Sequence, residues 1–218
     1  MSLAQFIDHT VLKPLTSAKD IERLCAEAAE HGFKAVCVPP YYVSRAAELL
    51  KGGTAEVATV IGFPLGYSSP ETKTFEAAEA VDNGATELDM VMNLAAFRNR
   101  DMASLEKEIT AIAALARQNG ALVKVIIESG LLSDEEIIAC CDFYRNFDVA
   151  FLKTSTGFAE KGASVEAVRL MRRHLPSHIR IKASGGIRTY PFAKELIDAG
   201  ATRLGCSASV EIVREDHR

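Results

Sequence analysis

The sequence lacks the features of a membrane, secreted or nucleic-acid-binding protein. Its 218 residues carry a formal net charge of -4, so we expect no basic face for nucleic acid. No apolar run approaches the ~20 residues that span a bilayer, and the amino terminus does not read as a secretory signal peptide. The five cysteines are odd in number, show no Cys-x-x-Cys spacing and include an adjacent pair, which argues against a disulfide framework. We therefore expect a reduced, cytoplasmic protein without nucleic-acid or membrane partners.

Metal-ligand and dinucleotide motifs are also missing. His174 and His178 have i, i+4 spacing, but Pro176 lies between them and would disrupt a shared helix. No other histidine or cysteine pattern resembles a ligand set, so we expect no metal and no other cofactor. A Gly-x-Gly-x-x-Gly turn does not follow the first apolar segments, which disfavours an open doubly wound sheet.

What the sequence does contain is one theme repeated along the chain: a short apolar segment, a loop and an amphipathic helix. The eight expected strands are Ile7–Leu12, Ala35–Val38, Val57–Gly62, Glu87–Met92, Val123–Glu128, Val149–Lys153, Arg180–Ala183 and Arg203–Cys206. The expected helices are Ser17–His31, Tyr42–Leu50, Pro70–Asn83, Met102–Asn119, Ser133–Tyr144, Val165–His174, Pro191–Ala199 and Ala208–Arg214. Apolar strands that alternate with helices predict a parallel sheet, and eight units are the number that closes a barrel. We predict an α/β protein with a (β/α)8 TIM-barrel fold, formed by residues 1–218 as one domain.

Two lysines end apolar segments and open loops of small residues. Lys153 is followed by Thr-Ser-Thr-Gly, and Lys182 is followed by Ala-Ser-Gly-Gly. A buried ammonium is costly, so such a lysine either pairs with an acid or serves as an amine nucleophile. For a single strand lysine the ion pair is the commoner role, but two ammonium groups in one pocket lower the pKa of one of them. We therefore predict a lysine that forms a Schiff base.

Other polar residues stand at the carboxyl ends of expected strands, where the chemistry of a barrel lies. Asp89 follows Glu87 by two positions and shares its strand face, and Asp8, Cys37 and Lys124 belong to the same end of the barrel. Each also has a structural interpretation. Asp89 could simply neutralise a lysine, Asp8 could belong to a turn, and Cys37 is more often a small buried hydrophobe than a reactive thiol.

Glycine-rich loops follow the last two strands, at Ser184–Gly186 and Gly205–Ser207. In barrels these loops commonly bind phosphate through backbone N–H groups near a helix amino terminus. Turns need glycine in any case, so the glycines alone are weak support, but their position predicts a phosphorylated substrate.

Seven segments together resemble the deoxyribose-phosphate aldolase family over nearly the whole chain. The segments are Ile7–Lys13, Val36–Pro39, Val60–Gly66, Glu87–Asn93, Val123–Gly130, Phe151–Gly157 and Lys182–Arg188. The last two contain the Lys-Thr-Ser-Thr-Gly and Lys-Ala-Ser-Gly-Gly pair, which is highly specific to that family. The resemblance implies a metal-independent class I aldolase of deoxyribose phosphate catabolism. Such an enzyme interconverts 2-deoxy-D-ribose 5-phosphate with acetaldehyde and D-glyceraldehyde 3-phosphate, and the family suggests a homodimer.

The same resemblance implies roles for individual residues. Lys153 matches the Schiff-base lysine, Lys182 matches the second lysine that perturbs it, and Asp89 matches the acid that works with Lys182 in proton transfer. The remaining matches are the pocket positions Asp8, Cys37 and Lys124 and the phosphate contacts Gly157, Gly185, Gly186 and Ser207.

A few positions depart from the family pattern. Ala95 stands where many members have glycine, and Phe158 stands where some have lysine, which removes one candidate phosphate contact. Ala208 and Ser209 replace a serine and a glycine after the eighth strand. We expect these changes to affect phosphate affinity before they affect the type of reaction, because backbone amides do not depend on side-chain identity.

Two other functions fit parts of the sequence. Another Schiff-base aldolase or transaldolase would use the same lysine chemistry on a related phosphosugar. A non-catalytic phosphosugar-binding protein would also need the phosphate loops, but it would have no reason to keep both Lys153 and Asp89.

Overall fold

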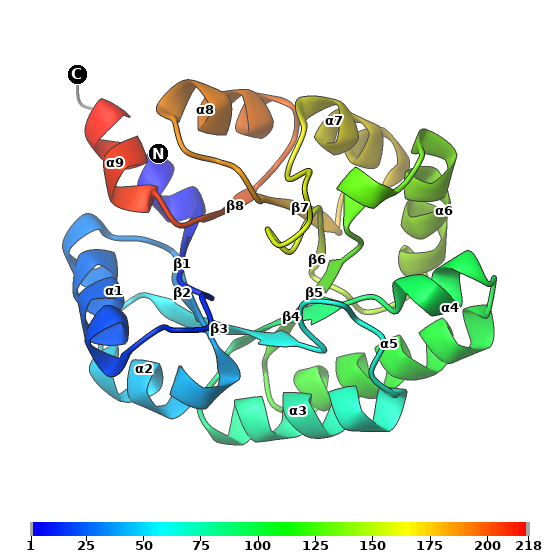
Figure 1. Cartoon of the computed structure of the whole chain (residues 1–218), viewed down its shortest axis with the longest axis horizontal. Helices are drawn as coiled ribbons and strands as arrows, with labels where there is room; N and C mark the ends of the chain where they lie inside the picture. The colour runs from blue at the N-terminus through cyan, green and yellow to red at the C-terminus, as the bar shows by residue number, and fades with distance from the viewer. Residues whose placement is uncertain (1, 217–218) are drawn as a thin grey trace.

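The computed structural model describes residues 2–216, and eight parallel strands in it form a closed barrel in sequence order (Figure 1). The strands are β1 (Ile7–Thr10), β2 (Ala35–Val38), β3 (Glu56–Ile61), β4 (Glu87–Val91), β5 (Leu122–Ile126), β6 (Phe151–Lys153), β7 (Arg180–Ser184) and β8 (Arg203–Cys206). Pairing of β1 with β8 completes the ring. The predicted (β/α)8 barrel is therefore confirmed.

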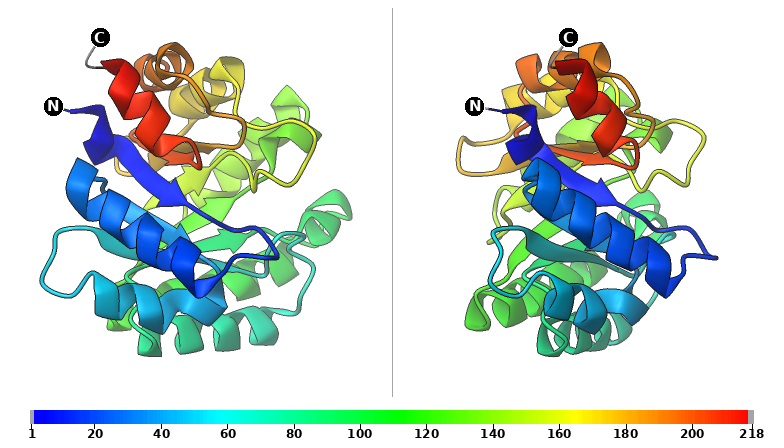
Figure 2. Two further views of the ribbon diagram at one scale, coloured as in Figure 1. Left: turned by 60° about the vertical axis from the view of Figure 1, so that its left-hand side comes forward. Right: turned by 90° about the vertical axis from the view of Figure 1, so that its left-hand side faces the viewer.

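Helices surround the strands on the outside of the barrel (Figure 1). They are α1 (Ala18–His31), α2 (Val43–Leu49), α3 (Pro70–Asp82), α4 (Leu94–Arg98), α5 (Met102–Gln118), α6 (Asp134–Tyr144), α7 (Val165–His174), α8 (Tyr190–Asp198) and α9 (Ser209–Asp216). Three short 3-10 helices accompany them: η1 (Leu3–Phe6), η2 (Pro40–Tyr42) and η3 (Ser129–Leu131). The first and last elements, η1 and α9, lie side by side (Figures 1 and 2). None of these helices is long and apolar enough to cross a membrane.

The helix boundaries follow local capping chemistry. Ser17 and Ser133 each form a capping box, with Asp20 and Glu136 respectively as the reciprocal partners. Gly32 ends α1 in the left-handed conformation, with φ 68°, which a residue without Cβ adopts readily. Serine capping boxes thus begin α1 and α6, and a left-handed glycine ends α1.

Several boundaries differ from the prediction. β1 ends at Thr10 rather than Leu12, and β5 ends at Ile126 because Glu128 turns into a left-handed conformation with φ 52°. β6 begins at Phe151 rather than Val149, because the Val149 N–H donates to Phe147 in a preceding turn. The helix α4 was not predicted, because five residues are too few to show a helical period; Asn93 caps it by accepting from Ala96 N.

The core is apolar between strands and helices and mostly polar inside the barrel. The large apolar cluster includes side chains of α1, α5 and α7 packed on the outer faces of the strands. A separate small cluster of Cys37, Ala58 and Val60 lies on β2 and β3. One buried ion pair outside the barrel interior was missed: Lys73 Nζ lies 2.7 Å from Glu108 Oε2 between α3 and α5. All five cysteines are free and buried.

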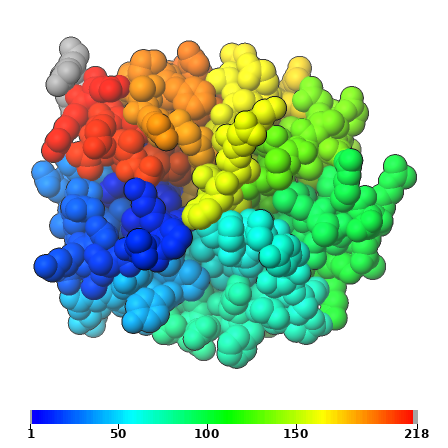
Figure 3. Space-filling view, in the orientation of Figure 1, coloured from blue at the N-terminus to red at the C-terminus, as the bar shows by residue number. Residues whose placement is uncertain are grey.

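The carboxyl ends of the strands form the mouth of the barrel. In the right panel of Figure 2 the arrowhead of β1 and the loop between β6 and α7 both lie on the right-hand side. Figure 3 shows that loop, in yellow, running across the middle of this face. It has little regular structure between Lys153 and α7, and it packs against neighbouring loops through Gly130 and Gly162. The mouth is therefore partly covered by the chain that follows Lys153.

Candidate active site

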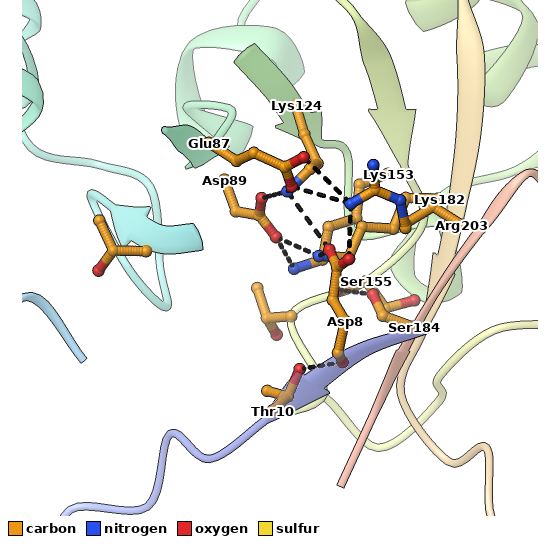
Figure 4. Close-up of polar contacts among 12 residues, drawn as sticks. Asp8, Thr10, Glu87, Asp89, Lys124, Lys153, Ser155, Lys182, Ser184 and Arg203 are labelled. Carbon is orange, nitrogen blue, oxygen red and sulfur yellow. Dashed lines mark hydrogen bonds and ion pairs between the residues drawn. The ribbon is translucent and has the colours of Figure 1, made fainter. Parts of the chain in front are cut away.

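The strand register brings the predicted polar residues to one level inside the barrel. Lys153 on β6 pairs with Lys182 on β7, and Asp89 on β4 pairs with Lys124 on β5. Asp8 is on β1, next to β8 across the closure of the barrel. Because alternate residues of a strand point to the same face, these side chains converge in the interior (Figure 4).

Asp89 is the centre of this group. Its Oδ2 lies 2.7 Å from Lys153 Nζ and 2.7 Å from Lys182 Nζ, and its Oδ1 lies 2.7 Å from Lys124 Nζ. One carboxylate thus accepts hydrogen bonds from three lysines, all of them buried. The two lysines singled out in the sequence share a single oxygen atom.

Asp8 forms a second centre that connects to Arg203, a residue missed in the sequence, and through Arg203 to Glu87. Its Oδ2 lies 2.5 Å from Lys182 Nζ, and its Oδ1 lies 2.6 Å from Arg203 Nη1. Arg203 also pairs with Glu87 at 2.9 Å, and Glu87 pairs with Lys124 at 2.6 Å. Arg203 is the first residue of β8 and shares a strand face with Gly205, two residues later. This position in the strand was the one feature of the sequence that could have placed Arg203 inside the barrel. A Cβ at Gly205 would meet Lys182 Cε at 3.2 Å, which shows how closely the two strands confine that lysine.

The network contains more positive than negative groups. Three lysines and Arg203 face three carboxylates, so full ionisation leaves one excess positive charge. Lys153 has a single acidic partner, which it shares, whereas Lys182 pairs with both Asp8 and Asp89. Loss of a proton is therefore least costly at Lys153.

The pKa shifts follow from these partners. Burial and the Lys182 ammonium lower the pKa of Lys153 despite the attraction of Asp89. Burial would also lower the pKa of Lys182, but Asp8 and Asp89 outweigh it and raise that pKa. The pKa values of the two lysines are thus shifted in opposite directions. Lys153 is the amine that loses its proton more readily, and Lys182 remains a cation.

Asp8, Asp89 and Lys124 are charged in the resting site. Burial alone would raise the pKa of Asp8 and of Asp89, but the lysines beside them hold both values below the ordinary range. For Lys124 the penalty of burial is exceeded by Asp89, Glu87 and Asp8, so its pKa lies well above the ordinary value. This arrangement provides a fixed charged floor beneath one titratable amine.

Cys37 takes no part in these hydrogen bonds. It is fully buried in the small cluster with Ala58 and Val60, and burial together with Asp89 raises the pKa of its thiol. Its surroundings are those of a small hydrophobic residue beside the network.

A cavity of about 700 Å³ lies above this floor. Of the predicted residues, those that line it are Lys153, Gly157, Gly185, Gly186 and Ser207. The side chains of Asp8, Cys37, Asp89, Lys124 and Lys182 lie in the interior beneath it and are buried. Four cations on the cavity wall, Lys13, Arg23, Arg188 and Arg214, outnumber its three acids, Asp20, Glu27 and Glu211. The cavity thus combines an amine at its base with glycine-rich loops and cations around it.

The glycine loops are held in conformations that favour glycine. Gly157, Gly185 and Gly186 have φ values of 85°, 89° and 78°. Gly162 and Gly185 touch through their backbones, so a Cβ on Gly162 would lie 2.2 Å from Gly185 O. The loops after β6 and β7 therefore form one closely packed wall.

The departures from the family pattern have identifiable surroundings. Ala95 lies within α4, and Phe158 packs edge-on against Phe63, with ring centroids 5.1 Å apart. Ala208 is partly buried. Ser209 is fully buried; its hydroxyl donates to Cys206 O and lies 2.9 Å from His9 Nδ1.

Glu128 is a further buried acid at the mouth. It follows β5 and accepts hydrogen bonds from both the backbone N–H and the hydroxyl of Thr156, three residues after Lys153. Burial raises the pKa of Glu128, while Thr156 and the Lys153 ammonium oppose that shift.

Within residues 2–216, no group of three or more His, Cys, Asp or Glu side chains is arranged to hold a metal ion.

Comparison with known proteins matches residues 2–209 to the family described as DeoC/LacD family aldolase. The chain is 51% identical over 214 residues to the deoxyribose-phosphate aldolase of Exiguobacterium sibiricum, covering 98% of this chain and 96% of that one. It is 47% identical to the deoxyribose-phosphate aldolase of Caldanaerobacter subterraneus subsp. tengcongensis, covering 99% and 94%.

Solved structures give the same result. A putative deoxyribose-phosphate aldolase from Coccidioides immitis superposes with a TM-score of 0.95 at 45% identity, covering 99% of this chain and 86% of that one. A deoxyribose phosphate aldolase from Aeropyrum pernix, described as tetrameric, superposes with a TM-score of 0.92 at 34% identity, covering 99% and 91%.

Proposed function

Because the chain belongs to the DeoC/LacD family of aldolases, we propose that it reversibly cleaves 2-deoxy-D-ribose 5-phosphate to acetaldehyde and D-glyceraldehyde 3-phosphate. It is a carbon–carbon lyase, and its nucleophile is the amine of Lys153. The observation that carries this assignment is the asymmetry between the two lysines. They share Asp89 Oδ2, yet only Lys153 has a lowered pKa and lines the cavity.

The reaction begins when neutral Lys153 attacks the C1 aldehyde of the open-chain sugar. Loss of water gives an iminium ion, which withdraws electrons from the adjacent C2–C3 bond. Removal of the C3 hydroxyl proton breaks that bond and releases D-glyceraldehyde 3-phosphate. The enamine left on Lys153 is protonated at carbon, and hydrolysis of the resulting iminium releases acetaldehyde. The iminium ion that the amine forms is the electron sink, so the proposed mechanism is metal-independent and uses no cofactor.

Asp89 and Lys182 are the proposed proton-transfer pair. They lie 2.7 Å apart, and Asp89 also accepts from Lys153, so a proton can pass between them next to the atoms that react. Asp8, itself 2.5 Å from Lys182, keeps that lysine charged and oriented. Lys124 anchors Asp89 from the other oxygen, and Cys37 fills the wall beside them.

The phosphate end of the substrate is proposed to bind at Gly157, Gly185, Gly186 and Ser207. These residues line the cavity with Lys153, and α9 begins directly after the Ser207 loop. Backbone N–H groups near a helix amino terminus favour an anion, and the arginines of the wall add charge. The buried hydroxyl of Ser209 is used by His9 and Cys206, which leaves the backbone of that loop for the phosphate.

Product identification tests the reaction itself. With 2-deoxy-D-ribose 5-phosphate we expect acetaldehyde and D-glyceraldehyde 3-phosphate in equal amounts, and with both aldehydes we expect the sugar phosphate. A second candidate, another Schiff-base aldolase or transaldolase, predicts a different preferred donor or acceptor when several aldehydes and phosphosugars are compared. A phosphosugar-binding protein without catalysis predicts binding and no products.

Replacing Lys182 with methionine tests the origin of the lowered pKa. The variant removes a positive charge next to Lys153. Asp89 then pairs with two lysines instead of three, so its attraction for the Lys153 ammonium is stronger and the pKa of Lys153 should rise. Only the neutral amine reacts, and therefore the rate of imine formation with acetaldehyde should fall at neutral pH and reach its plateau at a higher pH than in the wild type. Rapid borohydride reduction at a series of pH values measures this, and an unmoved inflection would refute the electrostatic explanation.

Replacing Gly185 with alanine tests the phosphate loops. The new Cβ would lie 3.0 Å from Gly162 Cα and 3.4 Å from Gly157 Cα, so it separates the packed loops. We expect KM for 2-deoxy-D-ribose 5-phosphate to rise ~10-fold, and KM for unphosphorylated 2-deoxyribose to stay the same. Gly120→Ala is the matched control, because φ is 69° there and its Cβ meets nothing within 4 Å. It should share the destabilisation of about 1–2 kcal/mol without the change in KM.

The cellular setting follows from the same assignment. We place the enzyme in the cytoplasm, in deoxyribose phosphate catabolism, because its five cysteines are free and buried, as expected in a reducing compartment. We also propose that the chain acts as a single domain and assembles as a homodimer, which light scattering of the purified protein measures.

A further inference from the structure

Glu128 combines a backbone conformation that non-glycine residues rarely adopt with a buried, ionisable side chain. It is one of two non-glycine residues with positive φ among the described part of the chain, with φ 52° and ψ 56°. It is also a buried carboxyl group, 3% exposed, whose pKa is raised by that burial. Strained and desolvated residues of this kind cluster at functional sites.

The contacts of Glu128 differ from those of the other interior acids. Asp8, Glu87 and Asp89 pair directly with lysine or arginine. Glu128 instead accepts from Thr156: the backbone N–H lies 3.2 Å from both carboxylate oxygens, and the hydroxyl donates to Oε2. Both oxygens therefore act as acceptors, as in an ionised carboxylate.

The backbone fixes this pairing from both sides. The Ile127 N–H donates to Lys153 O at 3.0 Å, and the Ser129 N–H donates to Thr154 O at 2.7 Å. Glu128 lies between these two bonds, so its distance from the chain that follows Lys153 is fixed. The two backbone bonds thus hold the Glu128 side chain within hydrogen-bonding distance of Thr156.

These bonds determine what Thr156 can offer to a ligand. Its hydroxyl hydrogen is given to Glu128, and one lone pair accepts from Phe158 N at 3.0 Å. One lone pair remains, and Thr156 lines the cavity that contains Lys153. Thr156 thus presents an acceptor, and no donor, to the substrate.

We propose that Glu128 is a positioning residue that fixes the Thr156 hydroxyl as a hydrogen-bond acceptor for a hydroxyl group of the sugar bound at Lys153. The inference rests on the proposed function and adds a determinant of substrate recognition to it. Hydroxylated substrates satisfy the remaining lone pair, whereas acetaldehyde, which has no hydroxyl, does not use it.

Glu128→Gln tests this role separately from packing. Glutamine has nearly the same shape as glutamate, but it can reverse the direction of the hydrogen bond with the Thr156 hydroxyl. Glutamine has one acceptor oxygen in place of two. Turning that oxygen toward the Thr156 hydroxyl would place the amide NH2 group against the Thr156 backbone N–H, and two donors repel, so the favoured orientation places the amide nitrogen beside the hydroxyl. The hydroxyl then accepts from the amide, and its hydrogen is released toward the cavity. A substrate hydroxyl can still donate to that oxygen only by competing with the amide. Because a buried charge is removed at the same time, the folded protein should not lose thermal stability.

The test compares Glu128→Gln, Thr156→Val, Thr156→Ser and the double variant Glu128→Gln with Thr156→Val. We expect kcat/KM for 2-deoxy-D-ribose 5-phosphate to fall about 10- to 100-fold in each of the first two, as for a buried substrate hydroxyl left without its hydrogen-bond partner. The double variant should be no worse than Thr156→Val, because Glu128 acts through Thr156. Thr156→Ser, which keeps the hydroxyl, should retain most of the activity. Borohydride trapping of acetaldehyde on Lys153 should proceed as in the wild type in all four.

The outcomes are distinct. Additive losses in the double variant, an unchanged kcat/KM in Glu128→Gln, or equal loss of acetaldehyde trapping and thermal stability would each overturn the role of Glu128. If the wild type itself forms no adduct with acetaldehyde at Lys153, the proposed function fails, and the inference fails with it.

Discussion

Lys153→Met abolishes cleavage of 2-deoxy-D-ribose 5-phosphate, with kcat/KM lower by on the order of 10⁴- to 10⁶-fold, as for loss of other covalent nucleophiles. Methionine has a similar length but offers no amine for the iminium ion. The variant should fold as well as the wild type, because the interior network has one cation in excess and Lys153 holds only a shared carboxylate. Steady-state kinetics and urea unfolding measure the two effects separately.

Lys73→Met is the matched control for this experiment. Lys73 is also a fully buried lysine, but its partner is Glu108, outside the barrel interior. Breaking that isolated pair leaves an uncompensated buried carboxylate, which costs about 3–5 kcal/mol of unfolding free energy. Its folded fraction should nevertheless retain normal kcat. Substantial kcat in Lys153→Met, with Lys73→Met inactive when folded, would refute the assignment of the nucleophile.

Asp89→Asn has the second largest expected effect and changes both stability and activity. The carboxylate serves three lysines, so its loss leaves Lys153 without a counterion and Lys124 and Lys182 with one acidic partner fewer, and it lowers the unfolding free energy by about 3–5 kcal/mol. The folded variant should lose ~10²- to 10⁴-fold in kcat, because proton transfer with Lys182 is removed. Glu87→Gln is the control: Glu87 pairs with Lys124 and Arg203, so stability should fall while most of kcat remains. Similar kcat values for the two variants would contradict a specific role of Asp89.

The pH dependence of stability gives the same variant a second readout. The pKa values of Asp8 and Asp89 lie below their ordinary value of 3.8, so these groups bind fewer protons in the folded than in the unfolded chain. Their contribution is fully present above the unfolded pKa and is lost as pH falls through the folded value. As pH falls from the ordinary value of 3.8 toward the lower folded value, the stability of Asp89→Asn should therefore decrease less steeply than that of the wild type.

The sequence predicted the barrel and the level of its site for a specific reason. Parallel strands in a closed barrel place their carboxyl ends at one mouth, so Lys153, Lys182 and Asp89 needed only correct strand assignments to be brought together. Alternation along Glu87-Leu-Asp89 likewise indicated that both acids point inward. Strand ends were less certain, because they depend on turns such as the left-handed conformation of Glu128.

Other features depend on contacts between strands that a single sequence does not specify. Arg203 could have been a solvent-exposed residue at the start of a strand, and only the register of β8 with β1 and β7 places it beside Asp8 and Glu87. The pairing of Lys73 with Glu108 joins α3 and α5, which pack against each other although α4 lies between them in the sequence. The difference in pKa between the two lysines also required the structure, since it arises from the second carboxylate that Lys182 reaches and Lys153 does not.

Borohydride trapping tests the central assignment most directly. The wild type is incubated with 2-deoxy-D-ribose 5-phosphate, reduced, and analysed by intact mass and peptide mapping beside Lys153→Met. The proposed mechanism predicts a single reduced adduct on the peptide that contains Lys153, and none in the variant. An adduct on the Lys182 peptide, or a folded wild-type protein without any adduct, would contradict it.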